Sequence, residues 1–219
     1  MPDDGDVAAN LAPASSAAPA ARGSRRLGPR LVQLYLGRAL YGLSMAVLVR
    51  AGLGVMPWDV LHQGIARTVG GSLGLVSAVV GALVLLLWIP LRQRPGVGTV
   101  SNVLVIGLSV DGSLAVIPSV HAMAARVLLV PVGIALNAVA TAAYIGVRLG
   151  PGPRDGLMTG LVARTGGSVR LVRTAIEVVV VATGWLLGGT LGVATVLYAV
   201  AIGPLVQPLL PRLTVADRR

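Results

Sequence analysis

The sequence contains no cysteine and no lysine, and charged residues make up only 12% of its 219 positions. Without cysteine the chain has no disulfide, no thiolate nucleophile and no cysteine-based metal site. The absence of lysine among 18 basic residues is typical of a GC-rich bacterial genome. The charged fraction is about half that of soluble proteins, and the mean hydropathy is +0.83. These values predict a polytopic membrane protein.

The sequence motifs of common enzymes are also absent. The chain has no H-E-x-x-H and no P-loop. Its two histidines stand 59 positions apart, which is a poor basis for a metal site. Asp59 and Asp155 meet the needs of an intramembrane aspartyl protease only nominally. We therefore expect no enzyme, no catalytic residue, no metal and no cofactor.

Six apolar runs approach the roughly 20 residues that a helix needs to cross a bilayer. They cover residues 31–50, 72–91, 99–117, 125–147, 171–188 and 191–210. With the N-terminus inside, 14 arginines flank the inner ends of these runs and three flank the outer ends. This positive-inside bias places both termini in the cytoplasm. It also accounts for the net charge of +10, so we expect no nucleic-acid partner.

The sequence repeats itself at a constant offset of 96 residues, a feature that decides the architecture. The offset pairs Pro57 with Pro153, Asp59 with Asp155, Gly64 with Gly160, Gly70-Gly71-Ser72 with Gly166-Gly167-Ser168, and GVGTV at 96–100 with GVATV at 192–196. Each copy holds three predicted spans, so the second copy must cross the membrane in the opposite sense. This predicts an all-α fold of six transmembrane helices as a 3+3 inverted-topology repeat.

The expected organisation has four parts. A disordered cytoplasmic tail at 1–29 precedes the first repeat at 30–122. The inverted second repeat occupies 123–211, and a cytoplasmic tail follows at 212–219.

One segment of each copy is too broken by glycine and proline to be a span. Five extended residues before Pro57 reach about 16 Å, and an 11-residue helix from Pro57 to Arg67 rises about 16 Å back. Two re-entrant helices whose Pro-x-Asp starts meet near the midplane fit these lengths. Two amphipathic helices lying in opposite interfaces fit as well; Val60 would then face lipid and His62 water.

Several motifs resemble a known family over about residues 30–211. They are PWDVLHQG, RPGVGTVSN, GPRDGLMTGL, VRTAIE and GWLLGG. Together they resemble the YczE/YyaS/YitT-type bacterial integral membrane proteins, and most closely the YczE group. The resemblance implies a small multi-pass protein of the bacterial plasma membrane, and it implies no particular substrate.

Polar residues in or beside the apolar runs are candidates for a substrate path, because charge at membrane depth is costly. These candidates are Asp59, Asp155, Arg154, His62, Trp58, Asn102, Asp111, Glu177 and Arg38. Four more positions, Pro57, Pro153, Gly64 and Gly160, recur in both copies and are expected to be structural.

Most candidates also have a structural interpretation. Both aspartates suit helix caps, Arg154 suits a cytoplasmic anchor, and His62 a simple hydrogen bond. Glu177 lies four residues after Arg173, which favours a local ion pair. Arg38 can snorkel to the surface or pair with Glu177. Two aspartates favour a proton or cation, whereas two helix N-termini favour an anion, so the charge of a substrate stays open.

Two functions remain after these exclusions. The first is a transporter or channel for a small molecule or ion, with its path at the repeat interface. The alternative is an accessory or scaffold protein that stabilises or regulates a membrane partner. In either case the lipid bilayer is a partner. A transporter would also bind an unknown solute, and an accessory protein would bind another membrane protein, including a second copy of itself. A transporter predicts a polar central cavity, and an accessory protein predicts a dry, well-packed centre.

Overall fold

The structure is a computed structural model that describes residues 27–215. The predicted disordered tail therefore lies largely outside the described residues, and so does the end of the C-terminal tail. The first described helix begins at Leu27, three residues before the predicted start of the first repeat.

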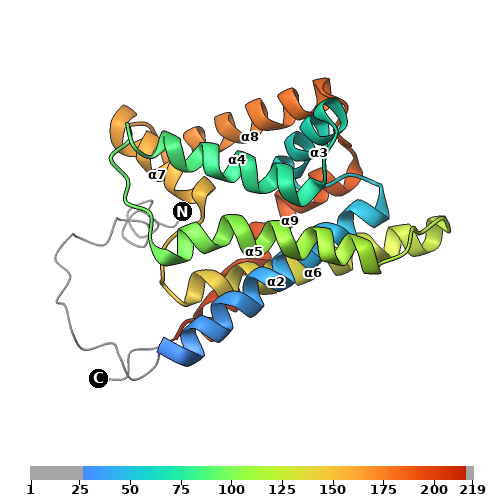
Figure 1. The fold of residues 1–219 in the computed structure, drawn as a ribbon, viewed down its shortest axis with the longest axis horizontal. Coiled ribbons are helices and arrows are strands. Elements are labelled where there is room, and N and C mark those ends of the chain that lie inside the picture. The colour runs from blue at the N-terminus through green and yellow to red at the C-terminus, as the bar shows by residue number, and fades with distance from the viewer. Residues whose placement is uncertain (1–26, 216–219) are drawn as a thin grey trace, which may run out of the picture.

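The described part of the chain is all-helical (Figure 1). The helices are α2 (Leu27–Ala51), α3 (Pro57–Val69), α4 (Leu73–Leu87), α5 (Val97–Val116), α6 (Met123–Gly146), α7 (Pro153–Thr165), α8 (Val169–Leu186) and α9 (Val193–Leu213). Helices α2 and α6 pack together, with α5 against α2 and α9 against α6. The shorter helices pair as α3 with α8 and α4 with α7, and α4 also packs along α5.

Within the described residues, four helices are long and apolar enough to cross a membrane: α2, α5, α6 and α9. A fifth span is possible if α3 and α4, which meet at 112°, count as one broken segment. The predicted spans at 72–91 and 171–188 correspond to α4 and α8. Helix α4 has only 15 residues, and the 18 residues of α8 include Arg170, Arg173 and Glu177.

The offset of 96 residues recurs in the backbone. Helices α2 to α5 begin at residues 27, 57, 73 and 97, and α6 to α9 begin at 123, 153, 169 and 193. Residues with positive φ also fall into pairs at this offset: 52 with 148, 54 with 150, 70 with 166, and 92 with 188. Gly54 and Gly150 share a φ of 121°, a conformation open to glycine and to few other residues.

Local sequence explains where the short helices begin and end. Proline occupies the first position of both α3 and α7, where its missing N–H costs no hydrogen bond. Gly70 and Gly166 come directly after the last residues of α3 and α7, and each glycine has a positive φ. Ser72 and Ser168 then cap α4 and α8 by accepting from backbone N–H groups three residues on, at 3.1 and 3.2 Å.

The two copies exchange contacts at the starts of α5 and α9. The N–H of Gly98 donates to the carbonyl of Leu149 at 3.1 Å, and the N–H of Ala194 donates to the carbonyl of Leu53 at 3.0 Å. These bonds are equivalent at the 96-residue offset. Each copy therefore holds the loop that leads into the short helix of the other copy.

Candidate functional site

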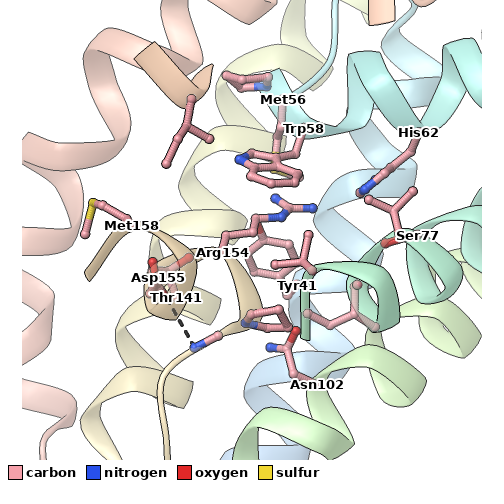
Figure 2. A pocket seen from close by; sticks show the side chains of 18 of the residues that line it. Tyr41, Met56, Trp58, His62, Ser77, Asn102, Thr141, Arg154, Asp155 and Met158 are labelled. Carbon is pink, nitrogen blue, oxygen red and sulfur yellow. Dashed lines mark hydrogen bonds between the residues drawn. The ribbon is translucent and has the colours of Figure 1, made fainter. Parts of the chain in front are cut away.

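The candidate site is a cavity of about 180 Å³ where the two copies meet (Figure 2). Every described helix contributes to its wall. Its polar lining includes Tyr41, His62, Ser77, Asn102, Thr141, Arg154, Asp155, Arg173, Glu177 and Tyr198. Six of the nine predicted path residues line it: Trp58, His62, Asn102, Arg154, Asp155 and Glu177.

The starts of α3 and α7 meet at this cavity. The guanidinium carbon of Arg154 lies 4.8 Å from the ring centroid of Trp58, which is within cation–π range. Figure 2 shows the Arg154 side chain extending beneath the Trp58 ring. Trp58 and Arg154 occupy equivalent positions in the two copies. The two copies therefore meet here through equivalent residues.

Burial of α3 separates the two interpretations of this helix. An interfacial helix would turn Val60 to lipid and His62 to water. In the structure Val60 is fully buried and His62 is 1% exposed. The residues that lead into the helix, Gly54 to Met56, are buried as well. The packing therefore favours a helix enclosed by protein.

Asp59 is buried without serving as a helix cap. The N-cap of α3 is Met56, which makes no side-chain cap bond in the described chain. Asp59 Oδ1 lies 3.1 Å from His62 Nδ1 and 3.9 Å from Arg154 Nη2. Its other oxygen, Oδ2, is buried and has no hydrogen-bond partner among residues 27–215. An unsatisfied buried oxygen costs roughly 1–3 kcal/mol, so folding alone does not explain this carboxylate.

Asp155 does what the capping interpretation expects. The N–H of Gly152, the N-cap residue of α7, donates to Asp155 Oδ2 at 3.2 Å, the bond dashed in Figure 2. The offset position of His62 in this copy is Met158, which also lines the cavity. In the second copy, therefore, the aspartate is hydrogen-bonded to a backbone N–H and has no histidine one turn away.

Sequence reasoning missed a tyrosine–asparagine exchange between the copies. The offset pairs Tyr41 with Asn137 and Asn102 with Tyr198. The Tyr198 hydroxyl donates to Asn137 Oδ1 at 2.7 Å, and Asn137 Nδ2 donates to Ser44 Oγ at 2.9 Å. Three of the four exchanged residues line the cavity. The same offset that identified the Pro-x-Asp pair carries this signal.

Glu177 forms the predicted local ion pair and Arg38 does not join it. Arg173 Nε donates to Glu177 Oε1 at 3.1 Å. Arg38 is buried, and its guanidinium donates to Ser101 Oγ and to the carbonyl of Gly98. It therefore neither snorkels nor reaches Glu177. Its two bonds hold the start of α5, whose Gly98 N–H in turn bonds the loop before α7.

Asp111 lies away from the cavity and joins two helices. Its Oδ1 accepts from the N–H of Gly74 at 2.8 Å, and its Oδ2 accepts from Ser72 Oγ. A carboxylate at a helix start is favourable because free N–H groups and the helix dipole point toward it. The offset position holds Gln207. Consistent with this, α4 packs along α5, whereas α8 does not pack along α9 in the described chain.

The four predicted structural residues sit at tight places. Pro57 and Pro153 open their helices. A Cβ on Gly64 would lie 2.5 Å from the carbonyl oxygen of Gly184, and one on Gly160 would lie 3.0 Å from Leu91 Cβ.

Trp88, which the sequence did not single out, fixes the start of α7. Its buried indole Nε1 donates to the carbonyl of Pro153 at 2.9 Å. The ring also covers Gly156, where a Cβ would overlap it.

No cluster of three His, Cys, Asp or Glu side chains with metal-binding geometry occurs among residues 27–215. The charged and polar groups in the cavity lining are two arginines, two carboxylates, one imidazole, and hydroxyl, phenol and amide groups.

Comparison with known proteins gives a family. Residues 28–210 match the sequence profile of a family of unknown function, DUF6198. An uncharacterized protein of Haemophilus influenzae is 38% identical over 174 residues, covering 80% of each chain. The uncharacterized membrane protein YczE of Bacillus subtilis is 29% identical over 173 residues, covering 78% of this chain and 80% of YczE. No solved structure matches.

Proposed function

The chain belongs to the DUF6198 family of YczE-type proteins, and we propose that it is a membrane transporter for a small solute or ion. In this proposal the solute passes through the cavity between the two copies. The protein lies in the bacterial plasma membrane with both termini in the cytoplasm.

The proposed topology is six crossings arranged as a 3+3 inverted repeat. Its support is the direction of equivalent helices in Figure 1: α2 and α5 run from left to right, and α6 and α9 from right to left. Helices α4 and α8 also oppose one another. Arg173 and Glu177 line the cavity and pair with one another, so α8 can cross a bilayer with these two charges paired at the cavity.

The observation that carries the proposal is a cavity beside the axis that relates the copies, with charged and polar side chains in an otherwise apolar wall. Inverted repeats suit alternating access, because the two halves can exchange conformations around a central site. A cavity of about 180 Å³ corresponds to about six water molecules at roughly 30 Å³ each. The solute it accepts is therefore small. The accessory interpretation expects a dry centre, which this lining does not provide.

Accessibility of the cavity from the two membrane faces tests the proposal. Since the chain has no cysteine, Met158→Cys places one thiol on the cavity wall. Membrane-impermeant thiol reagents are added to right-side-out and to inside-out vesicles. We expect this cysteine to react from both sides.

The matched control is Leu104→Cys on the outer surface of α5, where the side chain is 60% exposed and faces lipid in the proposed topology. It should react from neither side. If the cavity cysteine reacts from one side only, or from neither, the transport proposal fails and the accessory role becomes the better explanation.

A further inference from the structure

We propose that Asp59 and His62 form a proton-binding site, and that its charge controls the contact between the two repeats through Arg154. The coupling to the repeats rests on the proposed transport function. The binding of a proton does not, and it can be measured in the absence of any solute.

The position of Asp59 is the first argument. Its side chain is 1% exposed, yet Oδ2 has no partner in the described chain. A buried carboxylate in a structural role is normally paired or hydrogen-bonded at both oxygens. The cap role that would account for it is absent from α3 as described. Asp59 therefore has a buried oxygen without a hydrogen bond to any described residue, which lowers the stability of the fold. A functional role explains why it is there.

His62 connects this carboxylate to the cavity. The imidazole Nδ1 lies 3.1 Å from Asp59 Oδ1, and the ring is part of the cavity wall. Asp59 itself is not part of that wall. A proton arriving from the cavity therefore meets the imidazole first. Histidine is suited to this relay because small environmental changes move its protonation across physiological pH.

The groups around Asp59 favour a proton over a metal cation. The side-chain atoms that lie against its Oδ1 are nitrogens, His62 Nδ1 at 3.1 Å and Arg154 Nη2 at 3.9 Å. Tyr41 from α2 and Tyr198 from α9 also interact electrostatically with it. From α8, Arg173 and Glu177 face the same cavity and pair with one another. A hard cation needs several oxygen ligands, whereas a proton needs one lone pair.

Arg154 carries the state of this site to the other repeat. It lies on α7, rests on the ring of Trp58 on α3, and faces Asp59 Oδ1 at 3.9 Å. Among the described residues its guanidinium makes no hydrogen bond that would hold it elsewhere. With the site unprotonated, the aspartate–histidine pair has a net charge of −1 and attracts Arg154. One added proton brings the pair to zero and weakens that attraction, which frees α3 and α7 to separate.

The test uses the full-length protein in liposomes and follows the ring nitrogens of His62 by ¹⁵N NMR from pH 8 to pH 5, the span in which histidine changes charge. The chain has two histidines, so His121→Gln, at an exposed loop position, leaves one set of signals. We expect His62 to take up a proton, and Asp59→Asn to lower its proton affinity at least tenfold. The matched variant Asp155→Asn should leave that affinity within about twofold. A His62 that stays neutral throughout, or that titrates identically in Asp59→Asn, would overturn the site.

The coupling is measured with the Met158→Cys reporter at pH 8 and pH 5. We expect the ratio of labelling from the two sides to change at least threefold, and to become independent of pH in Asp59→Asn. If labelling occurs from both sides with a constant ratio, the coupling is overturned and transport stands. If His62 titrates with Asp59 but labelling never occurs from both sides, the proton site stands and the transport function fails.

Discussion

Helices α3 and α7 begin in the same way along the backbone. Each has proline as its first residue and aspartate as its third, after a glycine with φ of 121°. The side chains then diverge. Asp155 accepts from the N–H of its own N-cap residue, whereas Asp59 turns to His62 and Arg154. The backbone is the part that the duplication preserved, and the chemistry lies in what one copy changed.

The same contrast between equivalent positions and different side chains holds where Trp58 meets Arg154. A symmetric pair of residues at positions 58 and 154 would place either two aromatic rings or two cations against one another. The chain has one of each, Trp58 and Arg154, at 4.8 Å. A cation on an aromatic face is favourable by about 0.5–2 kcal/mol, and two facing guanidinium groups are not. Divergence of the copies therefore places an attractive contact where two arginines would repel one another.

The largest expected effect comes from filling the contact between α3 and α8. A Cβ on Gly184 would overlap the backbone of Val60 and Leu61. Since backbone cannot move aside as a flexible side chain can, Gly184→Val should exceed the usual overpacking cost of about 1–3 kcal/mol. We expect little folded protein, measured by size-exclusion profile and thermal unfolding in detergent. Gly203→Val is the control, because a Cβ there meets nothing within 4 Å; equal damage in both variants would refute this packing.

The next effect is an exchange of the two residues at the axis. Trp58→Arg places two guanidinium groups together and should cost about 2 kcal/mol, through loss of the cation–π contact and added repulsion. The double variant Trp58→Arg with Arg154→Trp should regain most of that loss, because the positions are equivalent. Thermal unfolding of the single and double variants measures the recovery. Additive losses in the double variant would show that the residues do not share one contact.

Much of the fold could be predicted because its signals are local or periodic. Proline at the first helical position and the Gly-Gly-Ser segment define both short helices, and the offset of 96 residues holds at every helix start. The bounds of α4 and α8 were less predictable. The predicted span at 72–91 continues four residues past the end of α4 at Leu87, because the apolar run is longer than the helix. The predicted span at 171–188 has the same length as α8 but begins two residues late, because the helix starts at Val169, before the charged Arg170.

The partners of the polar residues could not be predicted, because they come from distant helices. Nothing near Arg38 in the sequence indicates Ser101 and the Gly98 carbonyl on α5. Asp111 looked like a path residue, and its role as a cap for α4 depends on how two helices cross. Asp59 and Asp155 have the same local sequence signal and different partners. His62, which has Met158 as its counterpart, is visible in the sequence, whereas the approach of Arg154 to Asp59 comes from the packing of α7 against the first copy.

A smaller effect separates the two aspartates by stability. Asp155→Ala removes the acceptor for the Gly152 N–H, and loss of such a hydrogen bond costs about 0.5–1.5 kcal/mol. Asp155→Asn should recover most of the loss, because the asparagine side-chain oxygen can accept the same hydrogen bond. Asp59→Asn has no cap bond to lose and should destabilise less than Asp155→Ala. Thermal unfolding of the three variants gives the order, and a larger loss at Asp59 would mean that its carboxylate is structural after all.

The smallest effect is expected at the ion pair that only the second copy has, since the offset position of Glu177 is Gly81. Arg173 Nε lies 3.1 Å from Glu177 Oε1, but the two side chains are 59% and 32% exposed. Screening by water limits such a pair to less than about 0.5 kcal/mol, so Arg173→Gln should barely change thermal unfolding. Its charge nevertheless faces the cavity. If Arg173→Gln leaves stability intact and changes the labelling of Met158→Cys, the ion pair belongs to the solute path. If the variant lowers the free energy of unfolding by more than about 1 kcal/mol, the ion pair holds α8 in place. The two copies would then differ in structure as well as in chemistry.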